Sequence, residues 1–252
     1  RIPLTSGNSS LTNSIKGKSR LVLLNKANLA DPATMAEWFR WFEEQEIPVL
    51  FINCLDRPSL KQVISEAKSI IEKKRRDCNE DVSVKSKYKF MVIGLPNTGK
   101  STFINSIANR NATKVADKPG QTQVQLWIKV DDEIMLLDTP GIMPPEIQKD
   151  EHKIWLSLIN AIPDRIVGEE DPACYLVNYF LRKKSVEFQQ RYKLDSLDLG
   201  LDEALLKIAQ ARGCLKQKGL PDLERVFKLI LMDFRAGELG KVSFENPPKV
   251  PR

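Results

Sequence analysis

The sequence has a single histidine and only four cysteines among its 252 residues. No two of the cysteines are closely spaced; they are Cys54, Cys78, Cys174 and Cys214. This spacing argues against a structural zinc site and against the disulfide framework of a small secreted domain. A reducing compartment fits this cysteine usage best. No apolar run approaches the length of a membrane span, so we expect no transmembrane segment.

The charge balance has no strong excess of either sign. There are 39 Lys and Arg residues against 33 Asp and Glu residues, which gives a net charge of +6. This mild basic bias is compatible with a polyanionic partner but does not establish one. The composition, with 42% hydrophobic and 29% charged residues, is that of a soluble globular protein with one large or two modest domains. The chain begins at Arg1, without a methionine and within a motif, so we expect it to be truncated.

Strand and helix patterns alternate in the first part of the chain. Strands are predicted at 20–24, 48–52, 90–93, 124–130 and 133–137, and helices at 32–46, 59–74 and 102–108. This alternation is typical of a doubly wound α/β fold with a mostly parallel sheet. The charged segment at about 73–87 is a predicted linker. Helical patterns at 171–184, 201–212 and 221–236 predict a separate all-helical domain over 163–252, after an α/β domain over 1–162.

The segment Gly94-Leu-Pro-Asn-Thr-Gly-Lys-Ser101 fits the phosphate-binding loop pattern G-x-x-x-x-G-K-[ST]. It follows a predicted strand and opens a predicted helix, which is the setting that this motif needs. Its backbone N–H groups would wrap a β-phosphate, Lys100 would bring a cation to the β- and γ-oxygens, and the Ser101 hydroxyl would bind Mg²⁺. We expect further nucleotide contacts from Asn97, Thr98, Gly99 and Thr102.

Two further segments would sense the metal ion and the γ-phosphate. Asp138-Thr-Pro-Gly141 ends a strand, where the Asp138 carboxylate can hold Mg²⁺ through water and the Gly141 N–H can meet the γ-phosphate. The alternative is a simple turn. Thr122, in Pro119-Gly-Gln-Thr122, is the candidate switch threonine for Mg²⁺, the alternative being a threonine that starts a strand.

Asn25-Lys26-Ala27-Asn28 follows a predicted strand and is typical of a loop that reads guanine. Asn53-Cys54 follows the next strand and would give backbone contacts to the base carbonyl. The base-reading segment precedes the phosphate loop, whereas it comes after that loop in an ordinary GTPase. The motif order therefore predicts a circularly permuted GTPase domain that binds GTP or GDP with Mg²⁺.

The sequence resembles the YlqF/RbgA family of circularly permuted, ribosome-associated GTPases over nearly its whole length. Besides the motif order, the resemblance is carried by Arg1-Ile-Pro-Leu-Thr-Ser, Arg212-Gly-Cys-Leu215 and Gly240-Lys-Val-Ser-Phe-Glu. It implies a GTP-hydrolysing factor for late assembly of the large ribosomal subunit. Such a factor binds the rRNA of the subunit precursor, leaves on hydrolysis and is monomeric off the ribosome. The implied compartment is the bacterial cytoplasm, with the mitochondrial matrix as the alternative.

Two positions depart from the residues that GTPases usually have there. The fourth residue of the base-reading motif is usually Asp; here it is Asn28, whose amide has a single acceptor oxygen. Losing one charge-assisted hydrogen bond costs about 1.5–3 kcal/mol, so we expect weakened or relaxed guanine selectivity. Ile142 follows Gly141 where Ras-like enzymes have a glutamine that orients water, so slow intrinsic turnover is expected.

Catalysis would therefore need another group, and Lys100, Thr122 and Asn97 are the candidate catalytic residues. The loop resembles those of GTPases in which the asparagine that corresponds to Asn97 helps to bind K⁺. The alternative is that Asn97 only stabilises the turn. Basic residues of the helical part either contact rRNA phosphates or are solvated helix faces; they are Arg182, Lys183, Lys184, Arg191, Lys193, Lys216 and Lys218. The alternative function is a nucleotide-binding rRNA scaffold with little hydrolysis. An unrelated P-loop ATPase is a second alternative, weakened by Asn25-Lys26.

Overall fold

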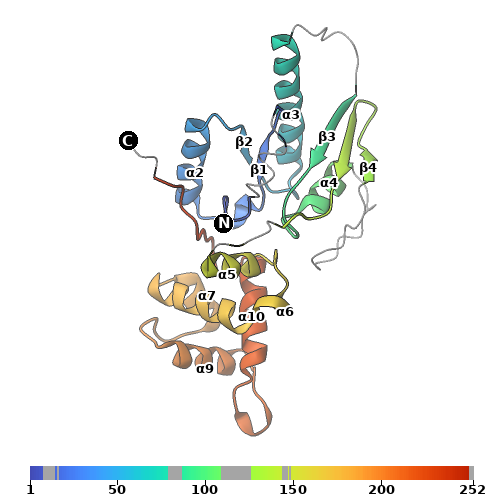
Figure 1. Cartoon of the computed structure of the whole chain (residues 1–252). Helices are drawn as coiled ribbons and strands as arrows, with labels where there is room; N and C mark the ends of the chain where they lie inside the picture. The colour runs from blue at the N-terminus through green and yellow to red at the C-terminus, as the bar shows by residue number, and fades with distance from the viewer. Residues whose placement is uncertain are drawn as a thin grey trace. The chain divides into compact units, whose positions relative to one another are not determined.

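The computed structural model describes residues 1–7, 15, 17–78, 87–108, 126–143, 147 and 149–249. The chain divides into two compact units (Figure 1). Arg1–Glu146 and Ser243–Arg252 form one, which we call the α/β unit, and Ile147–Val242 form the other, which we call the helical unit. None of the helices in the described part of the chain is long and apolar enough to cross a bilayer.

The described strands of the α/β unit form two small sheets. β1 (Val22–Leu24) pairs in parallel with β2 (Val49–Phe51), and β3 (Tyr88–Val92) pairs in parallel with β5 (Ile134–Asp138). β4 (Leu126–Lys129) pairs antiparallel with β5, which gives the order β3-β5-β4. The predicted α/β class with parallel pairing is confirmed, and β4 is the antiparallel exception. A short turn joins β4 to β5, and such a turn allows only antiparallel pairing.

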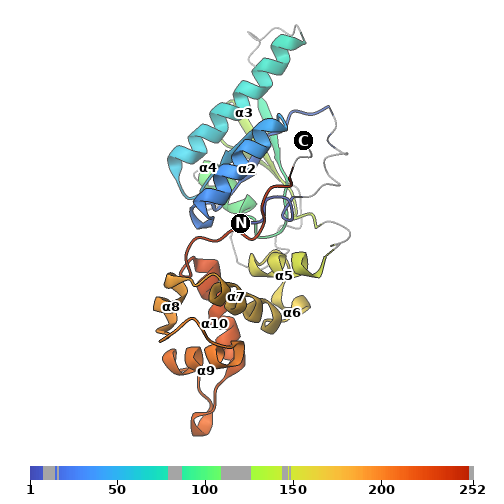
Figure 2. The same cartoon turned by 90° about the vertical axis from the view of Figure 1, so that its left-hand side faces the viewer.

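The two long helices of this unit are α2 (Pro32–Glu44) and α3 (Arg57–Asp77), both labelled in Figure 2. They begin in the same way. The Asp31 side chain accepts a hydrogen bond from Thr34 N, the Asp56 side chain accepts one from Ser59 N, and a proline occupies the first turn of each helix. These are standard N-terminal caps, and Asp31 directly before Pro32 is the sequence pattern that indicates the first of them.

The linker predicted from residue 73 was placed too early, because α3 continues to Asp77. Basic residues fill the last turn of this helix, where they suit the negative end of its dipole. A run of charged residues thus resembled a linker but extends the helix. Residues 79–86 of the predicted linker lie outside the described residues.

The core of the α/β unit lies between its strands and helices. Leu60 and Val63 of α3 pack in it with Phe103 and Ile104 of α4 (Lys100–Ala108). The strands contribute Ile128, Ile134 and Leu136, all buried. The periodic apolar positions of the sequence therefore form one core beneath the carboxyl ends of the strands, where ligands bind in α/β folds.

The helical unit contains six α-helices within its described residues. They are α5 (Asp150–Leu158), α6 (Asp164–Val167), α7 (Glu170–Arg182), α8 (Val186–Tyr192), α9 (Leu201–Ala211) and α10 (Leu223–Ala236). α5 packs against α7 and α10, so it belongs to this core. The domain boundary predicted between residues 162 and 163 is therefore too late.

A buried carboxylate joins two helices of the helical unit, α8 and α10. Asp233 of α10 accepts hydrogen bonds from Arg191 Nε and Nη2 at 3.0 and 2.6 Å and from the Tyr192 hydroxyl at 3.1 Å. Burial, the Asp233 charge and this hydrogen bond all raise the pKa of Tyr192. A buried charge is tolerated when it is paired and hydrogen-bonded in this way, so the cluster fixes α8 against α10.

After the helical unit the chain returns to the α/β unit as a segment that we call the C-terminal strap (residues 243–249). The Glu245 carboxylate accepts hydrogen bonds from Leu4 N and Thr5 Oγ1, each at 2.7 Å. The Glu245 carbonyl accepts one from Trp38 Nε1 at 2.9 Å, and Ser243 Oγ accepts one from Asp31 N at 3.2 Å. The end of the predicted 163–252 domain thus belongs to the α/β unit.

Candidate active site

The phosphate loop connects β3 to the N-terminus of α4. Its Leu95 carbonyl accepts hydrogen bonds from Lys100 Nζ at 2.7 Å and from Thr98 Oγ1 at 2.9 Å, which closes the loop on itself. Asn97 and Gly99 have left-handed backbones, with φ of 54° and 98°. Such turns direct successive N–H groups inward and form a concave site for an anion. The local structure is the cradle that the motif predicts.

The segment after β5 lies against this cradle. Parallel pairing places Val92 of β3 opposite Asp138 of β5, and Thr139 Oγ1 donates to the Val92 carbonyl at 2.7 Å. Ile142 N donates to the Gly94 carbonyl at 3.2 Å. A Cβ atom at Gly141 would lie 2.7 Å from Pro96 N, so only glycine allows this approach.

Asp138 is a buried carboxylate at the end of β5. It is 1% exposed, and neither of its oxygens has a hydrogen-bond partner among the described residues. Burial raises the pKa of Asp138, against the lowering effect of the nearby Lys100 cation. Burial likewise lowers the pKa of Lys100. An orphaned buried carboxylate beside a phosphate cradle fits a bound Mg²⁺, with Ser101 in the first turn of α4 as the second predicted ligand.

The base-reading segment is joined to the phosphate loop through one side chain. Asn25 Nδ2 donates to the Thr98 carbonyl at 2.9 Å, and Asn25 Oδ1 accepts from Cys54 N at 3.1 Å. A Cβ atom at Gly99 would lie only 2.2 Å from Asn25 Nδ2. Three segments that are far apart in the sequence therefore meet at one place, as the permuted motif order requires.

The rest of the base-reading loop is held by its backbone. Ala27 N donates to the Ile52 carbonyl at 3.0 Å, and Lys26 has a left-handed backbone with φ of 58°. Asn28 is exposed on the following turn, η1 (Ala27–Leu29). The amide oxygen of Asn53 accepts from Leu55 N at 3.1 Å. These bonds order the loop without using the Asn28 side chain.

Not every predicted site residue can be placed. Thr122 lies outside the described residues. Asn53-Cys54 is predicted to give backbone contacts to the base, and in this structure the Cys54 N–H donates to Asn25 Oδ1 and so orients the base-reading loop. Sequence reasoning missed Thr139, whose hydroxyl ties the two strand ends together; its place beside Asp138 was the available signal.

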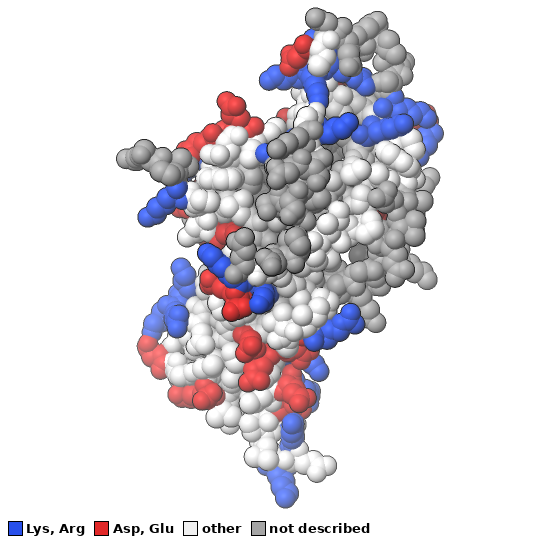
Figure 3. Space-filling view, in the orientation of Figure 1, with Lys and Arg blue, Asp and Glu red and all other residues white. Residues whose placement is uncertain are grey.

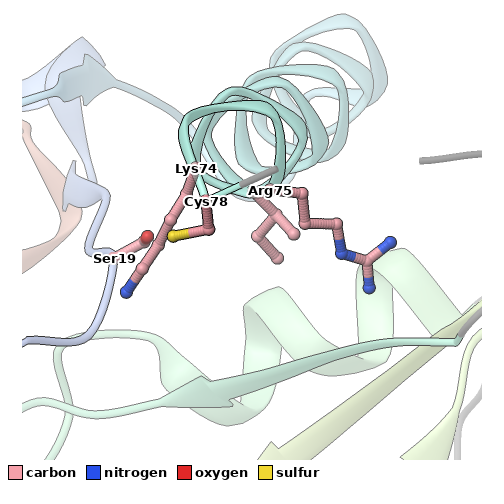
Figure 4. A pocket seen from close by; sticks show the side chains of 5 residues that line it. Ser19, Lys74, Arg75 and Cys78 are labelled. Carbon is pink, nitrogen blue, oxygen red and sulfur yellow. The ribbon is translucent and has the colours of Figure 1, made fainter. Parts of the chain in front are cut away.

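A shallow cavity of about 200 Å³ lies elsewhere, at the C-terminal end of α3 (Figure 4). Its lining includes Ser19, Lys74, Arg75 and Cys78. Lys74 Nζ donates to the Gly17 carbonyl at 2.6 Å, and the Arg75 guanidinium lies over the Tyr88 ring, 5.6 Å from its centroid. These cations are engaged within the protein, so the cavity offers no comparable ligand site.

Comparison with known proteins identifies the family of this chain. Residues 89–209 match a family described as 50S ribosome-binding GTPase. Ribosome biogenesis GTPase A of Priestia megaterium is 35% identical over 98% of this chain, and the match covers 86% of that protein. The chain belongs to the ribosome biogenesis GTPase A family. Mitochondrial ribosome-associated GTPase 1 of Mus musculus is 30% identical over 98% of the chain and 81% of its own length.

Solved structures agree on the fold of this ribosome biogenesis GTPase A family member. The crystal structure of GNP-bound YlqF from T. maritima matches with a TM-score of 0.64 over 98% of this chain and 89% of that chain. At 24% identity this likeness supports the fold alone. The curated relatives and the family match make the chain a GTPase, and membership of such a family implies GTP and GDP as nucleotides.

Proposed function

We propose that this GTPase is an assembly factor for the large ribosomal subunit that contacts the subunit's rRNA and leaves after GTP hydrolysis. The observation that carries the proposal is the Asn25 bridge, because it joins a base-reading loop to a phosphate cradle in the order of this family. The names of its relatives, among them Ribosome biogenesis GTPase A of Bacillus pumilus at 35% identity, supply the ribosomal partner.

In the proposed mechanism the described residues bind and position. Lys100 would exchange its bond to the Leu95 carbonyl for the β- and γ-phosphate oxygens, and Gly141 N–H would sense the γ-phosphate. Asp138 and Ser101 would hold Mg²⁺, with Thr122 as the proposed third group. When bound, Mg²⁺ neutralises charge on the phosphate oxygens. Catalysis is then mainly positional and electrostatic.

Turnover without the ribosome should be slow. Ile142, 37% exposed, has an apolar side chain that cannot orient water. We propose that Asn97, held at a tight left-handed turn of the phosphate loop, helps to bind K⁺ near the developing charge. Exchanging K⁺ for Na⁺ should lower ribosome-stimulated phosphate release, and unchanged release would restrict Asn97 to its turn.

The structure separates the candidate rRNA contacts in the helical unit. Arg191 is held by Asp233 and Glu238, and Lys184 is paired with Asp198. Like Arg182, Lys183 and Lys193, the side chains of Lys216 and Lys218 are exposed and form no ion pair with any described residue. They lie in the loop between α9 and α10, the orange loop of Figure 1, where Lys and Arg side chains are exposed in Figure 3. We propose this loop as an rRNA phosphate contact.

The backbone of this loop is well defined, which favours a docking role over a flexible tail. Lys216 N donates to the Leu220 carbonyl at 2.7 Å, and Asp222 N donates to the Cys214 carbonyl at 2.8 Å. Lys218 sits at the tip with a left-handed φ of 67°. This backbone conformation holds the Cβ of Lys218 at the tip of the loop, from which its exposed, flexible side chain extends.

The test of the proposal is binding and phosphate release with purified large subunits. Subunits should stimulate GTP hydrolysis, and replacing both Lys216 and Lys218 by Ala should reduce the salt dependence of subunit binding by about one unit of slope per lysine. The double variant Lys184→Ala/Lys207→Ala is the matched control, since both lysines are already paired with aspartates. Absence of stimulation with retained binding would favour the alternative, a nucleotide-binding rRNA scaffold with little hydrolysis.

The relatives leave two host compartments open for this family. We propose the bacterial cytoplasm, with the mitochondrial matrix as the alternative, because both bacterial and mitochondrial relatives cover 98% of the chain. We also propose that the protein is a monomer away from the ribosome. Sedimentation of the purified GTPase, with and without subunits, tests this statement directly.

A further inference from the structure

The position of Asn28 in the folded loop bears on which purine base this site prefers. Asn25 fixes the start of the loop through its bonds to Thr98 and Cys54. Its far end is fixed where Asp31 N donates to Ser243 Oγ at 3.2 Å. Between these anchors Asn28 lies on the η1 turn with an exposed side chain. The loop therefore presents an amide where base-reading loops of this type present a carboxylate.

Asp31 and Asp56, the first acidic residues after β1 and β2, do not replace the missing charge. Asp31 is engaged at the N-terminus of α2, where its Oδ2 accepts from Thr34 N at 2.8 Å and from Thr34 Oγ1 at 2.7 Å. Asp56 is engaged in the same way at α3, where its Oδ2 accepts from Ser59 N at 3.1 Å and from Ser59 Oγ at 2.7 Å. Both acids that follow the base-reading strands are thus held as helix caps, and moving either would uncap a helix.

The hydrogen-bonding groups at positions 1 and 2 of the purine then decide which base the Asn28 amide prefers. Guanine presents two donors on this edge, N1–H and the 2-amino group, which suit the two acceptor oxygens of a carboxylate. An asparagine amide has one acceptor and one donor group, so its NH₂ faces the 2-amino group of guanine without a partner. Xanthine presents the N1–H donor and a 2-oxo acceptor, which match both halves of the amide. Hypoxanthine has N1–H and no substituent at position 2, so it loses one bond but meets no clash of donors.

We propose that the base site of this protein is complementary to 2-oxopurine nucleotides, and that it binds xanthosine nucleotides more tightly than guanosine nucleotides. This inference rests on the proposed nucleotide site and adds to it a substrate class. The 2-amino group of guanine is unfavourable in this site, so the order of affinity is xanthosine, then inosine, then guanosine diphosphate. With Asp at position 28 the order of the last two reverses, because the 2-amino group gains an acceptor.

Equilibrium competition among XDP, IDP, GDP and ADP against a fluorescent nucleotide tests this order, and diphosphates avoid hydrolysis during the measurement. The wild-type protein should bind XDP about tenfold or more tighter than GDP, the effect of one matched hydrogen bond. Asn28→Asp should invert this ratio by a similar factor. Asn28→Ala, which removes donor and acceptor together, should abolish the preference for XDP while leaving the fold intact, because the Asn28 side chain is exposed.

Several outcomes would overturn the inference. GDP binding tighter than XDP in the wild type would contradict it while leaving the proposed GTPase site in place. A preference for XDP that persists in Asn28→Ala would show that another group reads position 2. Failure of all four nucleotides to bind would remove both the proposed site and this inference, and equal affinity for all four would show that the loop does not read the base.

Discussion

Substituting Gly99 by alanine tests the junction between the base-reading loop and the phosphate loop. The new Cβ would lie 2.2 Å from Asn25 Nδ2, and φ at this residue is +98°, where side chains are strained. The Asn25 amide would have to rotate away. It would then lose its bond to the Thr98 carbonyl at 2.9 Å and the bond from Cys54 N at 3.1 Å.

These losses allow the decrease in the free energy of unfolding to be calculated approximately. Each hydrogen bond contributes about 1 kcal/mol, and the left-handed backbone adds about 1–2 kcal/mol of strain for alanine. The free energy of unfolding of the α/β unit should therefore fall by about 3–4 kcal/mol, as the sum of these terms. Nucleotide affinity should fall with it, because the two halves of the site are no longer joined.

Denaturant unfolding and nucleotide titration measure both effects. Gly17→Ala is the matched control, because this glycine lies in the same unit, has φ of +79° and has no described atom within 4 Å of a new Cβ. Its substitution should therefore cost backbone strain alone. In an Asn25→Ala background the clash and both bonds are already gone, so Gly99→Ala should cost only the strain, a coupling of about 2 kcal/mol. Equal costs of Gly99→Ala in the two backgrounds would refute the bridge.

Three further substitutions have defined expectations. Asp138→Asn should raise the stability of the nucleotide-free protein by about 1–3 kcal/mol and abolish its stabilisation by Mg²⁺, both read from unfolding curves, because it removes a buried charge whose oxygens accept no hydrogen bond from a described residue. Burial raises the pKa of Asp138 in the folded state. Between the unfolded pKa and this raised pKa, the folded protein binds more protons than the unfolded protein. The free energy of unfolding should therefore fall as the pH rises through this interval. Asp138→Asn should remove that slope, and an unchanged slope would assign it to another group. Glu245→Ala should lower the free energy of unfolding of the α/β unit by about 2 kcal/mol through loss of charge-assisted bonds to residues 4 and 5, with Glu245→Gln showing a smaller loss; equal losses would contradict the role of the charge. Asp233→Ala should destabilise the helical unit by about 3–5 kcal/mol in circular dichroism melts, since it leaves Arg191 without its buried partner, and a loss below 1 kcal/mol would refute the cluster.

The local rules of the sequence predicted most elements to within a few residues. Asp31 before Pro32 predicted the start of α2, and the apolar runs predicted the strands, because capping and side-chain periodicity act over one or two helical turns. The same rules failed at residue 73, where a charged run extends α3. They also failed at residue 163, since the membership of α5 in the helical core depends on packing against α7 and α10.

In the candidate site, too, local sequence patterns predicted some residues, whereas contacts between distant segments could not be predicted. Lys100, Ser101 and Gly99 belong to a contiguous motif, so their placement follows from one strand, one turn and one helix. Thr139 and the engagement of Cys54 N by Asn25 involve partners far apart in the chain. No pattern within a short window contains that information, so sequence reasoning assigned Cys54 to the base and left Thr139 without a role.

The sequence by itself determined the chemistry of the site, because motif residues and their order specify which groups can bind phosphate, base and metal. It also determined the family, through motif order. Only the tertiary structure decided that the Asn25 amide bridges the two loops, that Asp138 is buried with no hydrogen bond to its oxygens from the described residues, and that the C-terminal strap returns to the α/β unit. The physical reason is that burial and long-range hydrogen bonds depend on which distant segments meet, and short-range propensity does not determine those meetings.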